Sequence, residues 1–298
     1  MNGPLRLGWI AVISLSASCT PSKMSLTTLQ SNIEKELSGK KGTFAVAFKD
    51  LKTGEEISIN DEEVFHAAST MKTPVMIEVY KQVAEGKFSL NDSIELRNEF
   101  SSIVDGSSYS LDSADDSEQD LYQHIGEKRS IASLLYQMIT MSSNFATNLV
   151  IQKVGAENVT RSMRELGAKN IEVLRGVEDN KAFEKGLNNT TTAHDLLVIF
   201  EKIALGEAVS DTASEAMMRI LLDQKFNEII PAKLPKDVKV AHKTGYITHV
   251  HHDSGIVILP DGRKYVLVLL SKNWEDEKIT IRTMADISYL IYKHVARR

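Results

Sequence analysis

Two residues whose types can do acyl-transfer chemistry stand three positions apart, at Ser69 and Lys72. They open an apolar run of helical character, and residues three apart on a helix face the same side, so the amine can reach the hydroxyl. A serine hydroxyl is a weak nucleophile until a neighbouring base accepts its proton. The free N–H groups at a helix start also favour a developing oxyanion. Because this spacing is common by chance, it predicts a nucleophile only together with other motifs.

Two further short motifs carry polar side chains at junctions between expected elements. Ser142-Ser143-Asn144 follows a helical segment, and Lys243-Thr244-Gly245 ends an apolar strand-like run. Each has an ordinary structural interpretation, because Ser and Asn commonly fill helix junctions and a lysine followed by glycine suits an edge strand before a turn. The functional interpretation is that a cation beside a hydroxyl donor binds a carboxylate, while Gly245 leaves room for substrate to approach the strand.

The three motifs occur in the order S-x-x-K, S-x-N and K-T-G, which resembles the class A β-lactamases among the penicillin-recognising serine hydrolases. The resemblance runs from about Thr43 to the C-terminus and includes residues 138–141 and 190–192. Two residues depart from the family's pattern. Ser143 stands where class A enzymes usually carry aspartate, and Tyr246 is bulkier than the small residue usual after K-T-G, so it would narrow the pocket.

The resemblance implies a role for each motif residue in forming an acyl-enzyme. Ser69 would attack the acyl carbon, and Lys72 would help to remove its proton. The backbone N–H groups of Ser69 and Tyr246 would form the oxyanion hole. Ser142 would pass a proton to the leaving nitrogen, and Asn144 would hold the substrate's amide side chain.

The same resemblance assigns Lys243 and Thr244 to the substrate's carboxylate, with Gly245 and Tyr246 beside them in the binding site. The expected ligand is therefore a small molecule, either a β-lactam or a cell-wall peptide. We expect no cofactor, and we expect the protein to be a monomer.

Water activation separates a β-lactamase from a protein that only becomes acylated. Class A enzymes use a glutamate on a loop before the threonine-rich segment, and residues 175–189 form that loop here. Glu184 matches the family's local E-x-x-L-N pattern, but Thr190 follows it too soon. Glu178 lies about as far from Ser142 as the family's glutamate does. The base therefore stays open between the two glutamates, or neither, with spacing favouring Glu178.

Three functions share the acylation residues. The first is a β-lactamase that hydrolyses its acyl-enzyme. The second is a penicillin-binding D-alanyl-D-alanine carboxypeptidase acting on cell-wall peptides. The third is a non-turnover sensor module that stays acylated. We favour the first, although the sequence ranks no individual substrate.

Charge and histidine placement bear on other ligand classes. The 298 residues carry a net charge of −5, with Lys and Arg spread among carboxylates, so no basic groove for nucleic acid is expected. His249, His251 and His252 lie close in sequence, and the first and second should alternate on one side of a strand. A metal would need a third ligand on that side, and only Asp253 is near. We expect structural or rim histidines and no metal.

The N-terminus has the layout of a secretory signal. Arg6 precedes the apolar run Leu7–Leu15, which is too short for a bilayer span of about 20 residues. Small residues follow, and then the only cysteine, Cys19, which resembles the lipid-attachment cysteine of bacterial lipoproteins. We expect an exported bacterial protein, periplasmic or anchored to the membrane through lipid on Cys19, with residues 1–18 as signal peptide and 19–26 as tether.

Hydrophobic periodicity indicates which elements position these motifs. The expected helices at the two ends cover residues 27–37 and about 276–295. Between residues 69 and 223 the pattern is mostly helical, and a capping box at 192–195 should open one of these helices. Strand-like runs occur at 43–48, 56–59, 238–244, 253–259 and 264–270. A polar stretch with five close carboxylates, residues 101–120, is expected to be a solvated loop.

Strands at both ends around a helical middle predict an α/β (α+β) fold. One antiparallel sheet would be built from both termini and flanked by helices, with an inserted all-helical lobe, as in β-lactamases and transpeptidases. We expect a single catalytic domain over residues 27–298. Its sheet lobe would comprise 27–68 and 238–298, and its helical lobe 69–237.

Overall fold

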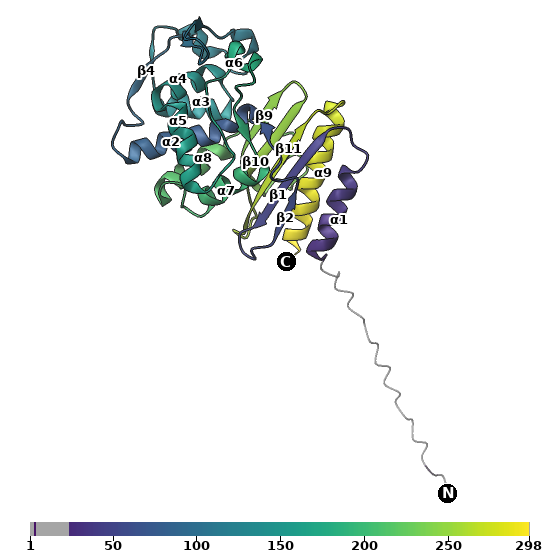
Figure 1. Ribbon diagram of the computed structural model, residues 1–298. Coiled ribbons are helices and arrows are strands. Elements are labelled where there is room, and N and C mark those ends of the chain that lie inside the picture. The colour runs from purple at the N-terminus through teal and green to yellow at the C-terminus, as the bar shows by residue number, and fades with distance from the viewer. Residues whose placement is uncertain (1–2, 4–23, 298) are drawn as a thin grey trace.

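A five-stranded antiparallel sheet forms the centre of the protein (Figure 1). The computed structural model describes residue 3 and residues 24–297, so the predicted signal peptide and Cys19 lie outside the described residues. The strand order is β2-β1-β11-β10-β9, and the strands are β1 (Thr43–Asp50), β2 (Glu56–Ile59), β9 (Lys239–Ile247), β10 (Val250–Ile258) and β11 (Lys264–Lys272). Strands from both ends of the chain thus build one sheet, as predicted.

Turn chemistry explains the first hairpin. Asp50 ends β1, and its Oδ1 accepts hydrogen bonds from the N–H groups of Lys52 (2.8 Å) and Thr53 (3.1 Å), which is the pattern of an Asx turn. Gly54 follows with φ +73°, a conformation that glycine adopts without steric cost. The two strands, which cover the predicted runs 43–48 and 56–59, therefore pair as an antiparallel hairpin.

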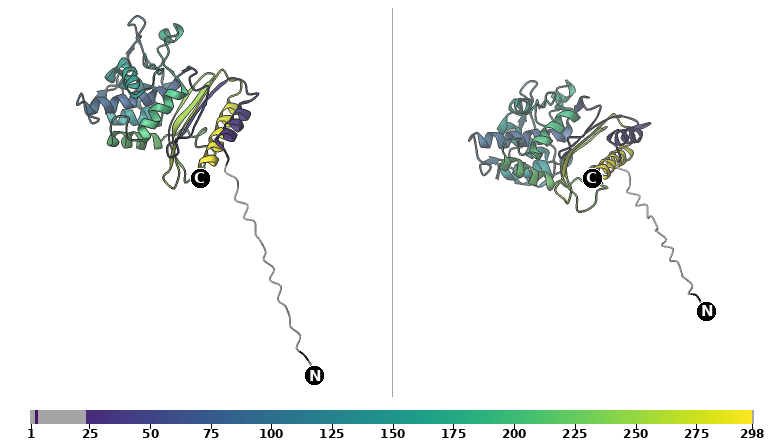
Figure 2. Two further views of the ribbon diagram at one scale, coloured as in Figure 1. Left: turned by 60° about the horizontal axis from the view of Figure 1, so that its bottom comes forward. Right: turned by 90° about the horizontal axis from the view of Figure 1, so that it is seen from below.

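Two helices cover one face of the sheet, α1 (Leu26–Leu37) and α9 (Glu277–Ala296). They lie side by side although they come from opposite ends of the chain (Figures 1 and 2). Ser25 and Asp276 cap their starts, because each side chain accepts the N–H three residues later. The apolar stripes of both helices pack on the strands and give a core that includes Leu29, Ile33, Phe44, Phe48, Tyr265, Ile287 and Ile291.

The opposite face of the sheet is covered by a helical region (Figures 1 and 2). Its helices are α2 (Lys72–Ala84), α3 (Ile131–Thr140), α4 (Asn144–Val154), α5 (Ala156–Leu166), α6 (Asn180–Glu184), α7 (Ala193–Ala204) and α8 (Asp211–Leu222). Thr192 caps α7 by accepting the N–H of Asp195 (3.1 Å). Because α7 packs directly on β1, β10 and β11, the sheet and the helices share one apolar core.

Short elements complete the described part of the chain, which includes three two-stranded pairs. The pair most relevant to the site joins β3 and β8, because β3 leads into the turn that holds Ser69. These strands are β3 (Phe65–His66), β8 (Thr190–Thr191), β4 (Ser93–Glu95), β7 (Lys128–Ser130), β5 (Phe100–Ser101) and β6 (Ser108–Tyr109). Three 3₁₀ turns accompany them, η1 (Ala68–Met71), η2 (Ser113–Asp115) and η3 (Asp120–His124).

The polar stretch 101–120 is not a solvated loop throughout, so that prediction is wrong at two carboxylates. Asp116 and Glu118 are buried. The carboxylate of Asp116 accepts the N–H groups of Asn144 (3.0 Å) and Phe145 (2.9 Å) at the start of α4. The first N–H groups of a helix have no partner within the helix, and a carboxylate satisfies them well. Pairing with a helix start therefore offsets the cost of burying this charge.

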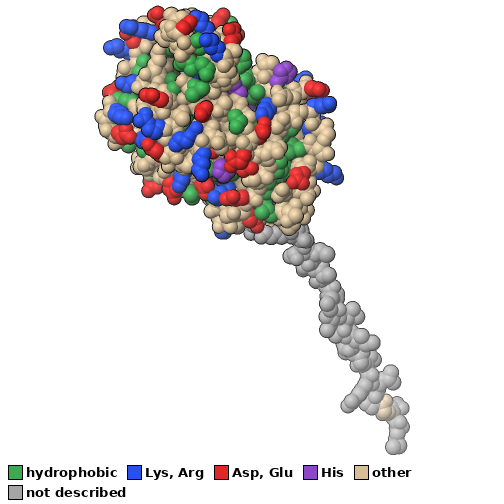
Figure 3. Space-filling view, in the orientation of Figure 1, with side chains coloured by type: hydrophobic (Ala, Val, Ile, Leu, Met, Phe, Trp, Pro, Cys, Tyr) green, Lys and Arg blue, Asp and Glu red, His purple; other side chains and the backbone are tan. Residues whose placement is uncertain are grey.

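The surface and helices add two observations. On the face drawn in Figure 3, basic and acidic side chains are interspersed over the helical region. Among the described residues, no helix is long and apolar enough to cross a membrane. The mixed α/β class with its antiparallel sheet is confirmed.

Candidate active site

Ser69 lies in a tight turn that leads into α2. The α-helix starts only at Lys72, after the 3₁₀ turn η1, whereas the sequence predicts a helix start at Ser69. Ala68 has φ +44°, an unfavourable backbone conformation for a residue with a Cβ, and its N–H donates to His66 Nδ1 (3.0 Å). Ser69 is half-buried and lines a cavity of about 350 Å³. Strained backbone beside a candidate nucleophile is typical of functional sites.

The Lys72 side chain is buried and hydrogen-bonded to the second motif. Its Nζ donates to Ser142 O (2.6 Å), Ser142 Oγ (3.2 Å) and Asn144 Oδ1 (2.9 Å). Burial lowers the pKa of Lys72 to about 7, although the negative charges of Asp116 and Glu178 oppose the shift. Within the described part of the chain, no hydrogen bond joins Lys72 to Ser69. The amine nevertheless reaches the Ser142 hydroxyl, which lines the same cavity as Ser69.

The three residues of the S-x-N motif have different structural roles. Ser142 has φ +58° and turns the chain between α3 and α4. Ser143 is fully buried, and its Oγ accepts the N–H of Ala146 (3.1 Å), so it caps α4. Serine and aspartate are both good N-caps, which explains how serine can stand where the family usually carries aspartate. Asn144 begins α4 and lines the cavity.

Lys243 is buried on β9 and points at the same serine. Its Nζ donates to Ser142 Oγ (3.0 Å) and to the carbonyl of Thr244 (2.9 Å). Burial, and after it the charge of Lys72, holds the pKa of Lys243 well below its ordinary value. The two motif lysines therefore converge on the Ser142 hydroxyl, while Thr244 lines the cavity.

The absence of a side chain at Gly245 has a second steric reason besides the predicted one. A Cβ on Gly245 would lie 3.1 Å from Thr70 Cγ2 and 3.2 Å from the backbone nitrogen of Ser69. The missing side chain therefore makes room for the turn η1 rather than for substrate alone. This close packing brings the end of β9 against Ser69. Tyr246 follows, lines the cavity and is 54% exposed.

Glu178 lies behind Asn144. Its Oε1 accepts a hydrogen bond from Asn144 Nδ2 (2.6 Å), so that Asn144 connects it to Lys72. Glu178 is half-buried, and burial raises the pKa of its carboxyl group, against the opposing hydrogen bond from Asn144. Its φ of +61° is unusual for a residue with a side chain. Asn148 supports this loop by accepting the N–H of Val177 (2.7 Å).

Glu184 lies in a different setting. It ends the short helix α6 and is exposed. Among the described residues, no hydrogen bond links it to Lys72, Asn144 or Ser142. Asp179, which the motifs did not indicate, holds this part of the loop, because its carboxylate caps α6 and accepts hydrogen bonds from Ser102 Oγ (2.8 Å) and the Ile103 N–H (2.9 Å).

The cavity wall includes residues that no motif indicates. Besides the motif residues, its lining includes Asp115, Ser117, Phe226, Glu228, His251 and Glu277. These side chains come from η2 and the residues just after it, the segment before β9, β10 and the first turn of α9. Since they are separated along the chain, only the three-dimensional structure brings them together.

The three neighbouring histidines have three different environments. His249 lies in the turn between β9 and β10 with φ +58°, so the prediction that it alternates with His251 along a strand is wrong. His252 is fully buried with Nε2 2.9 Å from the carbonyl of His66, and burial lowers its pKa to about 4. Only His251 lines the cavity. Asp253, the nearby residue considered as a third metal ligand, instead places its Oδ1 2.8 Å from His242 Nδ1.

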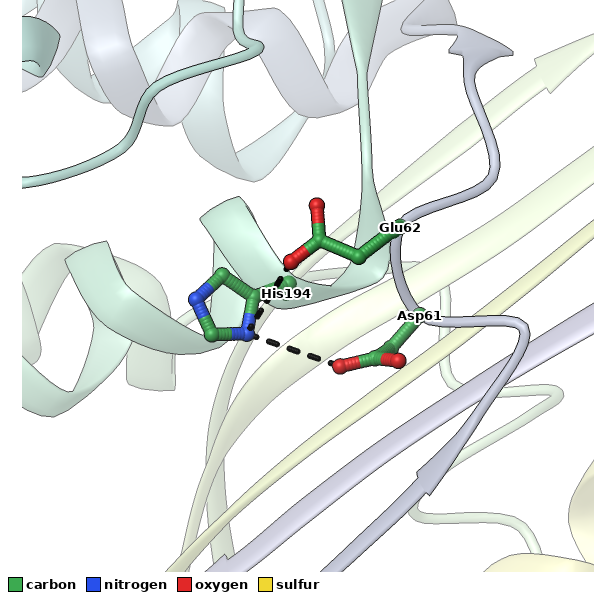
Figure 4. Close-up of side chains that lie close together, drawn as sticks. All are labelled: Asp61, Glu62 and His194. Carbon is green, nitrogen blue, oxygen red and sulfur yellow. Dashed lines mark ion pairs between the residues drawn. The ribbon is translucent and has the colours of Figure 1, made fainter.

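One group of metal-binding residue types lies outside the cavity, at Asp61, Glu62 and His194 (Figure 4). His194 Nδ1 is 3.5 Å from Asp61 Oδ2 and 3.9 Å from Glu62 Oε1. The backbone N–H of His194 also donates to Asp61 O (2.9 Å). These contacts join the turn after β2 to the start of α7.

Comparison with known proteins identifies the family. The sequence profile of the beta-lactamase enzyme family matches residues 28–295, so the chain belongs to this family. It is similar to the extended-spectrum beta-lactamase PER-1 of Pseudomonas aeruginosa, with 25% identity over 95% of this chain and 92% of the relative. The solved beta-lactamase of Sphaerobacter thermophilus is 26% identical with a TM-score of 0.78, covering 91% of this chain and 98% of that one. A variant of PBP-A, solved as an acyl-enzyme complex with penicillin G, is 29% identical with a TM-score of 0.78, covering 93% and 100%.

Proposed function

We propose that this protein is a serine β-lactamase that opens β-lactam rings through an acyl-enzyme on Ser69. The observation that carries the proposal is the convergence of both motif lysines on Ser142 Oγ, at 3.2 Å from Lys72 and 3.0 Å from Lys243, beside Ser69 in one cavity. A lysine that served only to stabilise the fold would not have to share, with a second lysine, a hydroxyl group that lines the cavity. Family membership and the similarity to named β-lactamases support the same reaction.

In the proposed first step, Ser69 Oγ attacks the ring carbonyl and its proton passes to Lys72 by way of the surrounding hydroxyls. With a pKa of about 7, much of Lys72 is neutral at neutral pH and can accept this proton. Ser142 then gives its proton to the ring nitrogen as the C–N bond breaks, and it takes a proton back from Lys72, whose Nζ donates to Ser142 Oγ. Lys243 and Thr244 hold the substrate's carboxylate. Asn144 holds the acyl side chain, and the backbone N–H groups of Ser69 and Tyr246 hold the oxyanion.

In the proposed second step, Glu178 removes a proton from a water that attacks the acyl carbon. The bond from that carbon to Ser69 Oγ then breaks, and Ser69 takes up the proton that Glu178 received. The hydrogen bond of Glu178 to Asn144 and its raised pKa support this role, because a stronger base at a fixed position takes the proton more readily. Glu184 is exposed and has no link to the motif residues among the described side chains. We therefore assign water activation to Glu178.

Time-resolved intact mass spectrometry with penicillin G tests this function. We expect an adduct of one penicillin that appears and then decays in the wild type. Ser69→Ala should give no adduct while its circular dichroism stays native, because only a half-buried hydroxyl is removed. A folded Ser69→Ala variant that still forms the adduct would refute the nucleophile assignment.

A penicillin-binding protein is the second candidate, favoured by the similarity to PBP-A. It shares the acylation residues and differs in the second step. A wild-type adduct that persists, together with release of the last residue from a D-alanyl-D-alanine peptide, would assign the protein to that class.

Export is proposed from the sequence. The charged, apolar and small-residue layout of residues 1–18 predicts a signal peptide, and Cys19 predicts lipid attachment. The mass of the mature protein expressed in a bacterium tests both. A lipidated chain beginning at Cys19 is expected, and Cys19→Ser should release it from the membrane fraction. An unmodified mature chain would refute the anchor.

A further inference from the structure

Three carboxylates line the cavity besides the motif residues. Asp115, Glu228 and Glu277 line it from three separate segments. No lysine or arginine is among its lining residues, and in the described part of the chain none forms an ion pair with these three carboxylates. Their charges are therefore not neutralised by the protein's own long basic side chains.

A buried histidine stands between two of these carboxylates. His251 is 4% exposed, with Nε2 3.7 Å from Glu228 Oε1 and Nδ1 3.7 Å from Glu277 Oε1. Its Nδ1 has no hydrogen-bond partner among the described residues. A buried polar atom without a hydrogen-bond partner is rare in native proteins, so this wall of the cavity is polar and incompletely paired within the protein itself. Even with a protonated His251, the two glutamates leave this group net negative.

Two aromatic rings also line the cavity. The ring of Tyr246 is 54% exposed and packs edge-on against His251, with centroids 5.2 Å apart. Phe226 lines the same cavity and is half-buried. The faces of aromatic rings attract cations, and the attraction adds to that of carboxylates.

We propose that Phe226, Glu228, Tyr246, His251 and Glu277 form a subsite, here called the cation subsite, that binds a positively charged group of the substrate such as a quaternary nitrogen or a pyridinium ring. The inference rests on the proposed function, since it concerns which β-lactams this cavity prefers. The cationic group would lie beyond the carboxylate contacts of Thr244, between Tyr246 and the two glutamates, and distant from the bond that breaks.

The test compares two cephalosporins that share ring and acyl side chain and differ only in a ring substituent, pyridinium in one and a neutral isostere in the other. The ratio of their kcat/KM values is measured for the wild type, for the double variant Glu228→Gln/Glu277→Gln and for Glu275→Gln. Glu275 is exposed, lies near Glu277 and does not line the cavity, so it is a matched control for loss of a charge. Comparing ratios between variants cancels the different intrinsic reactivities of the two substrates.

In the double variant, we expect the ratio of kcat/KM for the cationic substrate to that for the neutral one to fall about tenfold below the wild-type ratio. This is a typical size for charge and cation–π contacts that are partly solvated. The loss should appear in KM rather than kcat, because a contact far from the reacting carbonyl binds ground state and transition state alike. High salt should reduce the wild-type preference. The Glu275→Gln ratio should equal that of the wild type.

An unchanged ratio in the folded double variant would overturn the cation subsite. A second measurement does not depend on turnover. N-benzylpyridinium binding, followed by NMR titration, should be weaker in the double variant than in the wild type and in Glu275→Gln, and equal binding in all three would overturn the proposal. Absence of any Ser69 adduct with either cephalosporin would instead refute the proposed function, while the titration would still decide the subsite.

Discussion

At the scale of single residues, Ser142 connects the three motifs. A hydroxyl oxygen has two lone pairs and one proton. Lys72 and Lys243 both approach this oxygen, at 3.2 and 3.0 Å. When both donate, the serine proton must point away from them, toward the open cavity. This arrangement suits a group that gives a proton to a substrate atom, which is the role proposed for Ser142.

Glu178→Gln should acylate nearly normally and then stall. The amide keeps the size and polarity of the carboxylate but cannot take a proton from water, so only deacylation suffers. Loss of a general base typically slows its step about 10²- to 10⁴-fold. Intact mass spectrometry should show an adduct lasting many times longer than in the wild type.

Glu184→Gln is the matched control for this change, since both glutamates lie on the same loop. It should turn over as the wild type does. If Glu184→Gln stalls and Glu178→Gln does not, the role belongs to Glu184. If neither stalls, the water is activated by another group.

The acylation rate should depend on pH through Lys72. Its pKa is lowered to about 7, so the amine becomes neutral, and able to accept the Ser69 proton, as the pH rises through about 7. Pre-steady-state acylation should rise through this range and level off above it. In Glu178→Gln the inflection should move to lower pH, because the charge of Glu178 raises the pKa of Lys72. A rate independent of pH in this range would contradict Lys72 as the base.

At the scale of elements, Asp116 positions the S-x-N motif. Its carboxylate receives the first two N–H groups of α4 and also the Tyr122 hydroxyl (2.9 Å). The start of α4, which carries Asn144, is therefore fixed by a residue of another segment, the polar stretch 101–120 that precedes α3. Asp116 also acts on the chemistry, because its charge raises the pKa of Lys72.

Asp116→Asn should lower the free energy of unfolding by about 1–3 kcal/mol, the usual size for hydrogen bonds to a buried charge. An amide places an NH₂ group against N–H donors, so at least one bond is lost. Acylation should slow as well, since α4 carries Asn144. Urea unfolding gives the first quantity and mass spectrometry the second. Asp120→Asn, an exposed carboxylate nearby, should change neither, and equal effects in both variants would refute the anchoring role.

The elements that the sequence predicts best are those with local causes. The five sheet strands and both flanking helices follow from periodicity, turn residues and caps such as Ser25 and Asp276, all within a few neighbours. The burial of Asp116 could not be predicted, because its partner is the start of a helix distant in sequence. The steric reason for Gly245 could not be predicted either, since the contact with η1 is tertiary.

The motif residues of the site could be named from the sequence, because their spacing within each motif is local. The choice between Glu178 and Glu184 could not be made, since it depends on the path of the loop between α5 and β8. Of the cation subsite, the sequence indicated Tyr246 and His251, whereas Phe226, Glu228 and Glu277 gave no signal. The residues of the subsite stand singly in separate segments, and a lone glutamate is usually a solvated surface group.

At the scale of the whole molecule, the cavity lies where the end of β9 meets the helical region. Ser69, Ser142 and Asn144 come from turns and helices on one side, and Thr244 and Tyr246 come from the sheet. The lobe boundaries at 68/69 and 237/238 stay a prediction, and one apolar core spans the sheet and the helices. A substrate held at both ends should therefore stabilise the sheet and helical parts together.

Ligand protection should report this bridging. In Ser69→Ala, which lacks the proposed nucleophile, a penicillin at about a hundred times its Kd should stabilise the fold by about 2.7 kcal/mol. Hydrogen exchange should slow both in β9 and in the η1 and α4 segments, because the proposed carboxylate contacts lie on β9 and the acyl contacts lie on the helical side. The methyl ester of the same penicillin lacks the carboxylate charge, so it should protect η1 and α4 but leave β9 nearly as in the free protein. Equal protection of β9 by acid and ester would mean that Lys243 and Thr244 do not hold the carboxylate and that the two parts are not bridged by the substrate.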